Sequence, residues 1–415
     1  MILNSLRKYC HPIAALLALP VLFTGATAAA PVAQAFRFER ADYNPAILSL
    51  SFNLERGVAA APATEAADAF LDLILITRQG EPIGRRVALS RQRFATQLRT
   101  LYAQLAKQDS LEVTSPAAAT RQLYDALIGP LAEELRQQKV TTLLIAADRG
   151  LQGVPFAALH DGQQFLGERY AFAITPSLQF TSFSPPRSAA SRLLAAGASE
   201  FKGLAPLPLV PQELDRLSTT GVADQHLNQA FTPQVLLSQA ADPRYDRVHV
   251  ASHAEFLPGG PSKSVLHTGT GSMPLTDFLR LRQRRDGEPL ELFSLSACRT
   301  ALGDSATELG FAGLALQAGS RSAIGTLWYV DDVATSAYFL QLYRFLDQGM
   351  PKAEALQATR VAMIQRRLRL QGDQVLAADG TPLLVNLTAA QQRRVASGLN
   401  HPFFWGGIEL IGSPW

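Results

Sequence analysis

The sequence predicts an α/β fold in which a mostly parallel central sheet carries helices on both faces. Short apolar runs, each about as long as a buried strand, alternate along the chain with segments whose apolar residues recur at helical spacing. Such an alternation is typical of a parallel sheet covered by helices. The chain has 415 residues, of which 47% are hydrophobic and 18% charged, so it can build a large core in one or two domains.

The first part of the chain, residues 36–190, is expected to form an α/β half without catalytic residues. Predicted strands cover residues 47–52, 70–77 and 142–147. Between residues 90 and 108 the apolar side chains recur at helical spacing, and Ser90 is placed to cap this helix. A second helical region at 117–138 is interrupted at Gly129-Pro130. This half therefore alternates strands with helices.

The second part, residues 191–415, contains the candidate catalytic residues. The boundary falls in residues 181–191, which include Ser184-Pro185-Pro186-Arg187. Predicted strands cover residues 192–196, 248–251, 290–296, 322–328 and the end of the chain, and predicted helices cover 211–217, 232–240, 276–285, 307–318, 333–346 and 351–370. Residues 257–271 are rich in Gly, Pro, Ser and Thr, and we expect a mobile loop there.

Two chemically important side chains follow two of these strands. His253 comes directly after the run at 248–251, and Cys298 after the run at 290–296. If these strands are parallel neighbours, both side chains emerge at the same edge of the sheet, where open α/β folds bind ligands. An imidazole beside a thiol takes the thiol proton and leaves a nucleophilic thiolate. The pair therefore indicates an active-site dyad.

Two other interpretations of these residues are an inert buried thiol and a metal site. Free Cys is usually buried and inert. However, both residues follow strands, and their separation of 298 − 253 = 45 residues is close to that of His and Cys in caspases. A zinc site that adds His249 and His267 to the pair is disfavoured, because metal motifs use closer ligand pairs. We therefore expect neither a metal nor another cofactor.

The first 35 residues have the pattern of a secretory signal peptide. Arg7 and Lys8 form a positive region, residues 13–23 are apolar, and Ala33-Gln34-Ala35 offers a cleavage site. The apolar segment is shorter than the roughly 20 residues of a membrane span. We expect a periplasmic or secreted protein, cleaved after Ala35, with no membrane span in its mature chain. An uncleaved N-terminal anchor is the alternative.

Removal of this segment changes both the charge and the thiol count. The whole chain has 38 basic and 35 acidic residues, and residues 1–35 contain two of the basic ones and no acidic one, which leaves 36 against 35, or +1. This balance does not favour nucleic-acid binding. Arginines at 280–285 and 366–369 are expected to form solvated helix faces. Loss of Cys10 leaves Cys298 alone, and a lone thiol in a compartment that favours disulfides suggests a function.

Several motifs occur in a fixed order along the chain. They are residues 151–161, 168–178, Val250-Ala251-Ser252-His253, residues 295–303, residues 325–332, and His401-Pro402-Phe403-Phe404-Trp405. Together they resemble the CHAT domain, a caspase-like peptidase module related to separase, over roughly residues 70–415. Arg299 departs from this family, which commonly has Glu after the catalytic Cys. The tetratricopeptide repeats that usually accompany the domain are not found, so a regulatory partner would be a separate protein.

The resemblance implies a cysteine endopeptidase that forms a thioester acyl-enzyme. Cys298 would attack the peptide carbonyl, and His253 would act first as base and then as acid. The backbone N–H groups of Ala254 and Cys298 would form the oxyanion hole. Relatives resembling separase place a carboxylate after the Leu-Trp strand, which makes Asp332, then Asp331, candidates for binding a basic substrate side chain. The alternative for both aspartates is to cap the following helix.

The sequence is compatible with three functions. The leading prediction is an exported cysteine endopeptidase that acts on a protein or peptide substrate. The main alternative is a catalytically silent CHAT-fold module that binds protein. A hydrolase of small acyl substrates is a weaker third, because the same dyad supports acyl transfer in general. The intact pair of His253 and Cys298 favours an enzyme.

Overall fold

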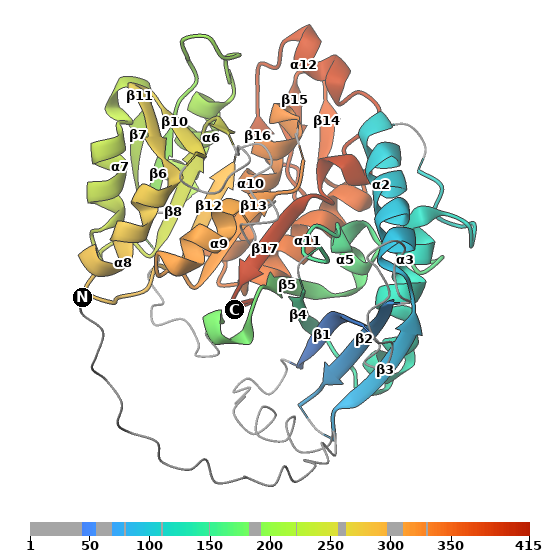
Figure 1. Ribbon diagram of the computed structural model, residues 1–415. Coiled ribbons are helices and arrows are strands. Elements are labelled where there is room, and N and C mark those ends of the chain that lie inside the picture. Colours follow the sequence, from blue (N-terminus) through green and yellow to red (C-terminus); the bar gives the residue numbers. More distant parts are fainter. Residues whose placement is uncertain are drawn as a thin grey trace, which may run out of the picture.

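The computed structural model describes residues 44–54, 69–78, 80–108, 111–148, 150–181, 192–220, 222–255, 263–296, 310–328 and 331–415. Within these ranges eleven strands form one continuous sheet (Figure 1). In order across the sheet they are β3 (Ile83–Ala88), β2 (Ala69–Ile76), β1 (Pro45–Leu54), β4 (Thr142–Ala147), β5 (Ala171–Thr175), β17 (Ile408–Gly412), β13 (Ser322–Thr326), β12 (Leu292–Ser296), β8 (Arg247–Ala251), β6 (Arg192–Gly197) and β7 (Val222–Leu227).

Neighbouring strands are mostly parallel, as predicted. Of the ten adjacent pairs described in this sheet, seven are parallel, and only β1–β2, β2–β3 and β13–β17 are antiparallel. The β13–β17 pair joins two parallel blocks that run in opposite directions. β17 comes from the C-terminal end of the chain but also pairs with β5 of the first half. The two halves of the chain therefore contribute to one sheet.

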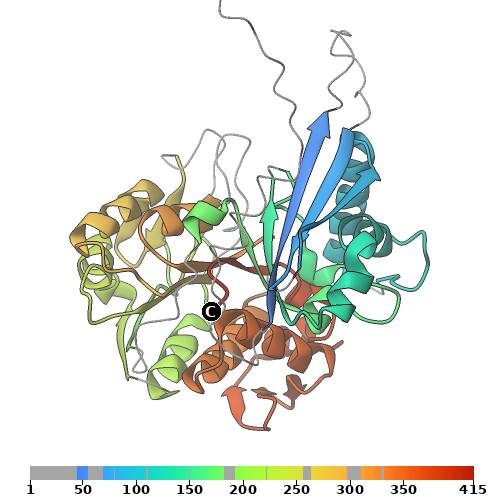
Figure 2. The same cartoon turned by 90° about the horizontal axis from the view of Figure 1, so that it is seen from below.

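Helices cover both faces of the second half of the sheet. Leu193 and Ala195 of β6 belong to one core cluster, and Leu194 and Ala196 to another, because successive strand side chains point to opposite faces. The first cluster includes α6 (Val210–Thr220), α10 (Asp332–Asp347) and α11 (Lys352–Ile364), and the second includes α7 (Pro233–Ala240), η5 (Leu275–Arg280), α8 (Leu281–Arg284) and α9 (Gly310–Gln317). Figure 2 shows the orange-red helices α10 and α11 on the opposite side of the sheet from α8 and α9.

The two helical regions predicted in the first half are present, and three short helical segments that were not predicted follow them. Together they are α2 (Arg91–Lys107), α3 (Ala119–Leu127), η1 (Gly129–Leu131), α4 (Ala132–Gln137), η2 (Phe156–Ala158), α5 (Leu166–Arg169) and η3 (Leu178–Phe180). Ser90 caps α2, because its Oγ accepts a hydrogen bond from the Arg93 N–H at 3.2 Å. Gly129 and Pro130 lie in the 3-10 turn that separates α3 from α4, as expected. Within the described ranges no helix combines the length and hydrophobicity needed to cross a bilayer.

Strands β3, β5 and β7 were not predicted, and two further stretches differ from the prediction. The expected loop at 257–271 contains β10 (Val265–Thr268), which forms a small sheet with β11 (Gly271–Pro274) and β9 (Ala254–Glu255), while residues 256–262 lie outside the described residues. Burial of Leu266 and Met273 holds this hairpin on the core despite its polar composition. The other stretch is the predicted helix at 351–370, which ends at Ile364.

The end of α11 has a local cause. Arg366 has a φ of 57°, in the left-handed region that ends an α-helix. The chain continues into a second small sheet and a short closing segment. These contain β14 (Arg369–Gln371), β15 (Gln374–Leu376), β16 (Pro382–Leu384), α12 (Ala389–Arg394) and η6 (Pro402–Phe404). A further 3-10 turn, η4 (Asn228–Ala230), follows β7.

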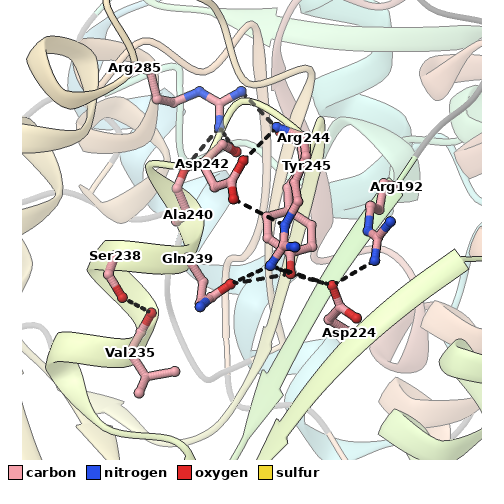
Figure 3. Close-up of polar contacts among 10 residues, drawn as sticks. All are labelled: Arg192, Asp224, Val235, Ser238, Gln239, Ala240, Asp242, Arg244, Tyr245 and Arg285. Atoms are coloured by element: carbon pink, nitrogen blue, oxygen red, sulfur yellow. Dashed lines mark hydrogen bonds and ion pairs between the residues drawn. The ribbon is translucent and has the colours of Figure 1, made fainter.

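Arg285 is buried, and the prediction that arginines 280–285 all form a solvated face was wrong for this residue. Its guanidinium donates to the main-chain carbonyls of Ala240 at 2.8 Å, Tyr245 at 2.9 Å and Glu288 at 3.0 Å. Figure 3 shows this side chain above the turn that leads into β8. The rigid fork of an arginine serves several carbonyls at once. Arg285 therefore ties the segment before β8 to the segment before β12.

A buried pair of an arginine and a glutamic acid side chain lies between α11 and β17. Neither Arg360 nor Glu409 has any exposed side-chain surface, and Arg360 Nη2 lies 3.7 Å from Glu409 Oε2. The same nitrogen donates to the Ile408 carbonyl at 2.6 Å. Burial raises the pKa of Glu409 to about 8, and the charge of Arg360 opposes this rise. The native protein therefore holds the carboxyl proton more tightly than the unfolded chain does.

Replacing Glu409 by Gln is expected to remove a pH dependence of stability. Since the pKa of Glu409 rises from 4.5 to about 8 on folding, the free energy of unfolding should fall as the pH rises through this interval. The side chain at position 409 cannot ionise in the Glu409→Gln variant. The free energy of unfolding of this variant should therefore fall less over the same pH interval. Thermal melting of both proteins from pH 5 to 8 measures the difference. Melting temperatures that change in parallel in the two proteins would contradict this assignment.

Candidate active site

The strands that precede His253 and Cys298 are parallel neighbours, which is the arrangement that the proposed dyad requires. β8 pairs with β12 in a register that sets Ala251 opposite Ser296. The Ser252 N–H also donates to the Ser296 carbonyl at 3.3 Å, so the pairing continues past the end of β8. Both chain segments thus leave the sheet at the same edge, and His253 stands two residues beyond Ala251. Cys298, two residues beyond Ser296, lies in residues 297–309, outside the described residues.

The ring of His253 is oriented by a main-chain carbonyl. Its Nε2 lies 2.8 Å from the carbonyl oxygen of Ala205. A carbonyl only accepts hydrogen bonds, so Nε2 carries the proton in this contact. The ring of Phe201 meets the imidazole edge to face, with centroids 4.7 Å apart. Since the partner of one ring nitrogen fixes the tautomer, Nδ1 is left as the proton acceptor.

The loop that supplies Ala205 follows β6, which lies beside β8 in the sheet. The Ser199 N–H in this loop donates to Asn228 Oδ1 at 2.8 Å, which anchors the loop to the end of β7. Gly197 ends β6, and a Cβ at this position would lie 2.8 Å from the Ala251 carbonyl. Only glycine allows so close an approach of the two chains. The carbonyl that orients His253 is therefore placed by the same strands that carry the histidine.

The N–H of Ala254 makes no hydrogen bond to the neighbouring strand β10 in the small sheet that contains this residue. Ala254 pairs with Leu266 in the antiparallel β9–β10 ladder, and the His267 N–H donates to the His253 carbonyl at 2.9 Å. Hydrogen-bonded and non-hydrogen-bonded pairs alternate in such a ladder. The Ala254 pair is therefore non-hydrogen-bonded, and its N–H does not point toward β10. Its role in an oxyanion hole stays a prediction.

Asp331 and Asp332 lie at the start of α10. Asp331 caps this helix, because its Oδ1 accepts from the N–H groups of Val333 at 2.9 Å and Ala334 at 3.1 Å. Arg394 Nε lies 2.8 Å from Asp331 Oδ2, and its Nη2 pairs with Asp332. Burial raises the pKa of Asp331. The capping alternative is thus confirmed for Asp331, and binding of a substrate side chain by these aspartates stays a prediction.

His249 belongs to a buried polar network. Its Nε2 lies 2.8 Å from Glu213 Oε1, and the Ser336 hydroxyl donates to Glu213 Oε2 at 2.5 Å. His267 is not part of this network, because its Nε2 lies 2.8 Å from Glu255 Oε1. In the part of the chain that the structure describes, no three His, Cys, Asp or Glu side chains converge as metal ligands would. The network of His249 joins β8 to α6 and α10.

The sequence did not reveal the part played by Ala205 and Phe201. Both lie in the loop after β6, and neither belongs to a recognisable motif. The only signal was that a strand at 192–196 precedes this loop. Its position beside β8 follows from the strand order, which local patterns do not specify.

The protein has an α/β fold, and its candidate site lies at the edge of the sheet where the parallel strands β6, β8 and β12 end. The family model of the CHAT domain matches residues 117–413, which is more than half of the chain. The protein therefore belongs to the CHAT domain family. None of the curated proteins that were compared matches the chain.

Two solved proteins show a similar arrangement. The Arg-specific cysteine proteinase gingipain R (RgpB) is 11% identical, with a TM-score of 0.41, and the match covers 73% of this chain and 69% of that one. Separase from the Saccharomyces cerevisiae separase–securin complex is 10% identical in one structure, with a TM-score of 0.47, over 90% of this chain and 30% of separase. A second separase–securin structure gives 9% identity, a TM-score of 0.48, and coverage of 89% and 30%. The chain thus spans less than a third of the separase chain.

Proposed function

We propose that the protein is a cysteine endopeptidase whose dyad is His253 and Cys298. The observation that carries this proposal is the parallel register of Ala251 with Ser296, which brings both chain segments to one edge. The hydrogen bond from His253 Nε2 to the Ala205 carbonyl adds to it, because it leaves Nδ1 to accept a proton. Membership of the CHAT domain family agrees with this chemistry.

The reaction follows from these groups. His253 Nδ1 takes the proton of the Cys298 thiol, and the thiolate sulfur attacks the carbonyl carbon of the scissile peptide. The oxyanion accepts hydrogen bonds from the N–H groups of Ala254 and Cys298. Collapse breaks the C–N bond, the leaving amine takes the proton from Nδ1, and a thioester remains. Water, deprotonated by the same nitrogen, then hydrolyses the thioester and regenerates the thiol.

We further propose cleavage after arginine or lysine, with Asp332 and Asp331 as the acidic pocket. In the structure these carboxylates already hold one guanidinium, that of Arg394. Planar carboxylate–guanidinium pairing is among the stronger ionic contacts in proteins. Arg394 is 47% exposed, so an incoming substrate arginine can displace it without disturbing the core.

The test is cleavage of fluorogenic peptides with Arg, Lys or Asp before the scissile bond. The full chain should cleave the Arg and Lys peptides, and Cys298→Ala should cleave none of them. Arg394→Ala should lower KM for the Arg peptide by about two- to fivefold, the effect of one exposed competing ion pair. Arg393→Ala, an exposed neighbour on α12, is the matched control and should change nothing. A preference for Asp would overturn the basic specificity, and activity that survives Cys298→Ala would overturn the dyad.

A catalytically silent interaction module is the second candidate. The pairing of Asp331 and Asp332 with Arg394 favours it, because the carboxylates assigned to a substrate are already neutralised. The two candidates differ in thiol chemistry. An interaction module needs no activated sulfur, so its Cys298 should react as an ordinary thiol.

We propose that the protein acts after export. Residues 1–35 would be removed as a signal peptide after Ala35, and the mature protein would be periplasmic or secreted. The support is the arrangement of positive, apolar and small residues in this segment, which lies outside the described residues. Its partners would be a protein or peptide substrate and a separate regulatory protein.

A further inference from the structure

A pocket of about 540 Å³ lies in the first half of the protein, between helix α2 and the loop that follows β4. Phe52, Phe94 and Leu98 give it an apolar lining, and Gly150 and Gly153 also line it. Its volume falls in the range of sites that bind small ligands or peptide side chains. None of these residues belongs to the candidate active site.

Positive charge surrounds this pocket. Arg91 and Arg99 line it, and both are exposed. Helix α2 has four basic residues and no acidic one. The guanidinium of Arg91 lies 4.8 Å from the centroid of the Phe52 ring, which fixes it at the edge of the apolar lining. Among the residues that the structure describes, the contacts of these two guanidinium groups are neutral: Arg91 lies over Phe52, and Arg99 Nη2 donates to Thr96 Oγ1 at 3.2 Å.

One end of the pocket is held rigidly. The Tyr102 hydroxyl donates to the Gly153 carbonyl at 2.7 Å, which ties α2 to the loop after β4. The ring of Tyr102 meets that of Trp328 edge to face, with centroids 5.7 Å apart. Trp328 in turn donates to the Phe403 carbonyl at 2.9 Å. The pocket is therefore built on fixed side chains and does not need to form when a ligand arrives.

We propose that this pocket binds an extended acidic peptide segment of a partner protein, with an apolar side chain inserted between Arg91 and Arg99. The two arginines are eight residues apart on α2, or about 12 Å along the helix axis. An extended peptide covers this distance in about four residues. Two carboxylates four positions apart therefore reach both guanidinium groups, and the side chains between them meet Phe94 and Leu98. The site does not depend on the proposed peptidase activity.

The probe is a fluorescein-labelled peptide, Gly-Ser-Gly-Glu-Leu-Phe-Ala-Glu, titrated with the full chain by fluorescence polarisation. We expect saturable binding that weakens about tenfold or more when both glutamates become Gln, because charge-assisted hydrogen bonds are lost. The double variant Arg91→Glu with Arg99→Glu should lose affinity to the same extent. Ala95→Trp, which fills the pocket without changing the charge, should also prevent binding.

The matched control is Arg93→Glu, an exposed arginine on the same helix that does not line the pocket. It should leave the affinity within about twofold of the wild type, as expected for a screened charge outside the contact. An equal loss with this variant would show general attraction to a basic helix and overturn the site. Binding of a ten-residue oligothymidine with the same sensitivity to Ala95→Trp would assign a nucleic acid instead. If the peptide shows no binding with a Kd of about 1 mM or lower, roughly the weakest affinity expected of a specific site, the proposal is also overturned.

Discussion

His253→Ala is expected to lower kcat for peptide cleavage by about 10²- to 10⁴-fold, the usual contribution of a general base and acid. The imidazole serves twice, because it takes the thiol proton and later gives a proton to the leaving amine. The two described residues that hold the His253 ring, Ala205 through its carbonyl and Phe201 through its ring, cannot carry out either step. KM should change much less than kcat. Steady-state kinetics on the Arg peptide measures both.

The matched control for this prediction is His267→Ala. His267 lies in the hairpin next to His253 and also meets Phe201, but its side chain pairs with Glu255 and not with a catalytic group. Its replacement should leave kcat close to that of the wild type. Retention of kcat within about tenfold by folded His253→Ala, or an equal loss in both variants, would contradict the assigned role.

Arg285→Met is expected to lower the free energy of unfolding by about 3 kcal/mol or more. The substitution keeps the apolar stem but removes the donors for the carbonyls of Ala240, Tyr245 and Glu288. Each buried carbonyl left without a partner costs roughly 1–3 kcal/mol. Urea denaturation measures the loss. Arg285 therefore has the largest predicted effect on stability, although it lies away from the candidate site.

Arg282→Met is the control for Arg285. Arg282 lies in α8, the short helix that Arg285 follows directly, but its side chain is exposed. Its replacement should change the stability by no more than about 0.5 kcal/mol, as is usual for surface positions. A loss below about 1 kcal/mol for Arg285→Met would mean that water satisfies the three carbonyls equally well.

The strands beside the candidate site could be predicted because they are buried on both faces. Residues 248–251 and 292–296 are mostly apolar, with His249, Ser294 and Ser296 as the polar exceptions, and they lie between polar or Gly-containing segments, which is typical of central strands in a parallel sheet. The alternation of strands and helices along the chain predicted a mostly parallel sheet, whereas the pairing of these two strands was a condition that the dyad requires. The edge strand β3 was missed, because its exposed Arg85 and Arg86 give it a polar pattern. Exposed edges carry little hydrophobic signal.

The order of the strands could not be predicted. β17 lies between β5 and β13, so the last strand of the chain joins the two halves. Local periodicity indicates that a segment is a strand but not which strand lies beside it. The carbonyl of Ala205 was missed for the same reason, since its role depends on β6 lying next to β8. The buried position of Arg285 was also invisible, because its neighbours in sequence are exposed arginines.

The rate at which iodoacetamide alkylates Cys298 tests the central claim most directly. The full chain and His253→Ala are treated near pH 7, and peptide mass mapping separates Cys298 from Cys10. An activated sulfur should react rapidly, and its rate should fall by about tenfold or more without the imidazole, because an ordinary thiol is mostly protonated at this pH. A slow rate that is the same in both proteins would show that the two residues do not share a proton.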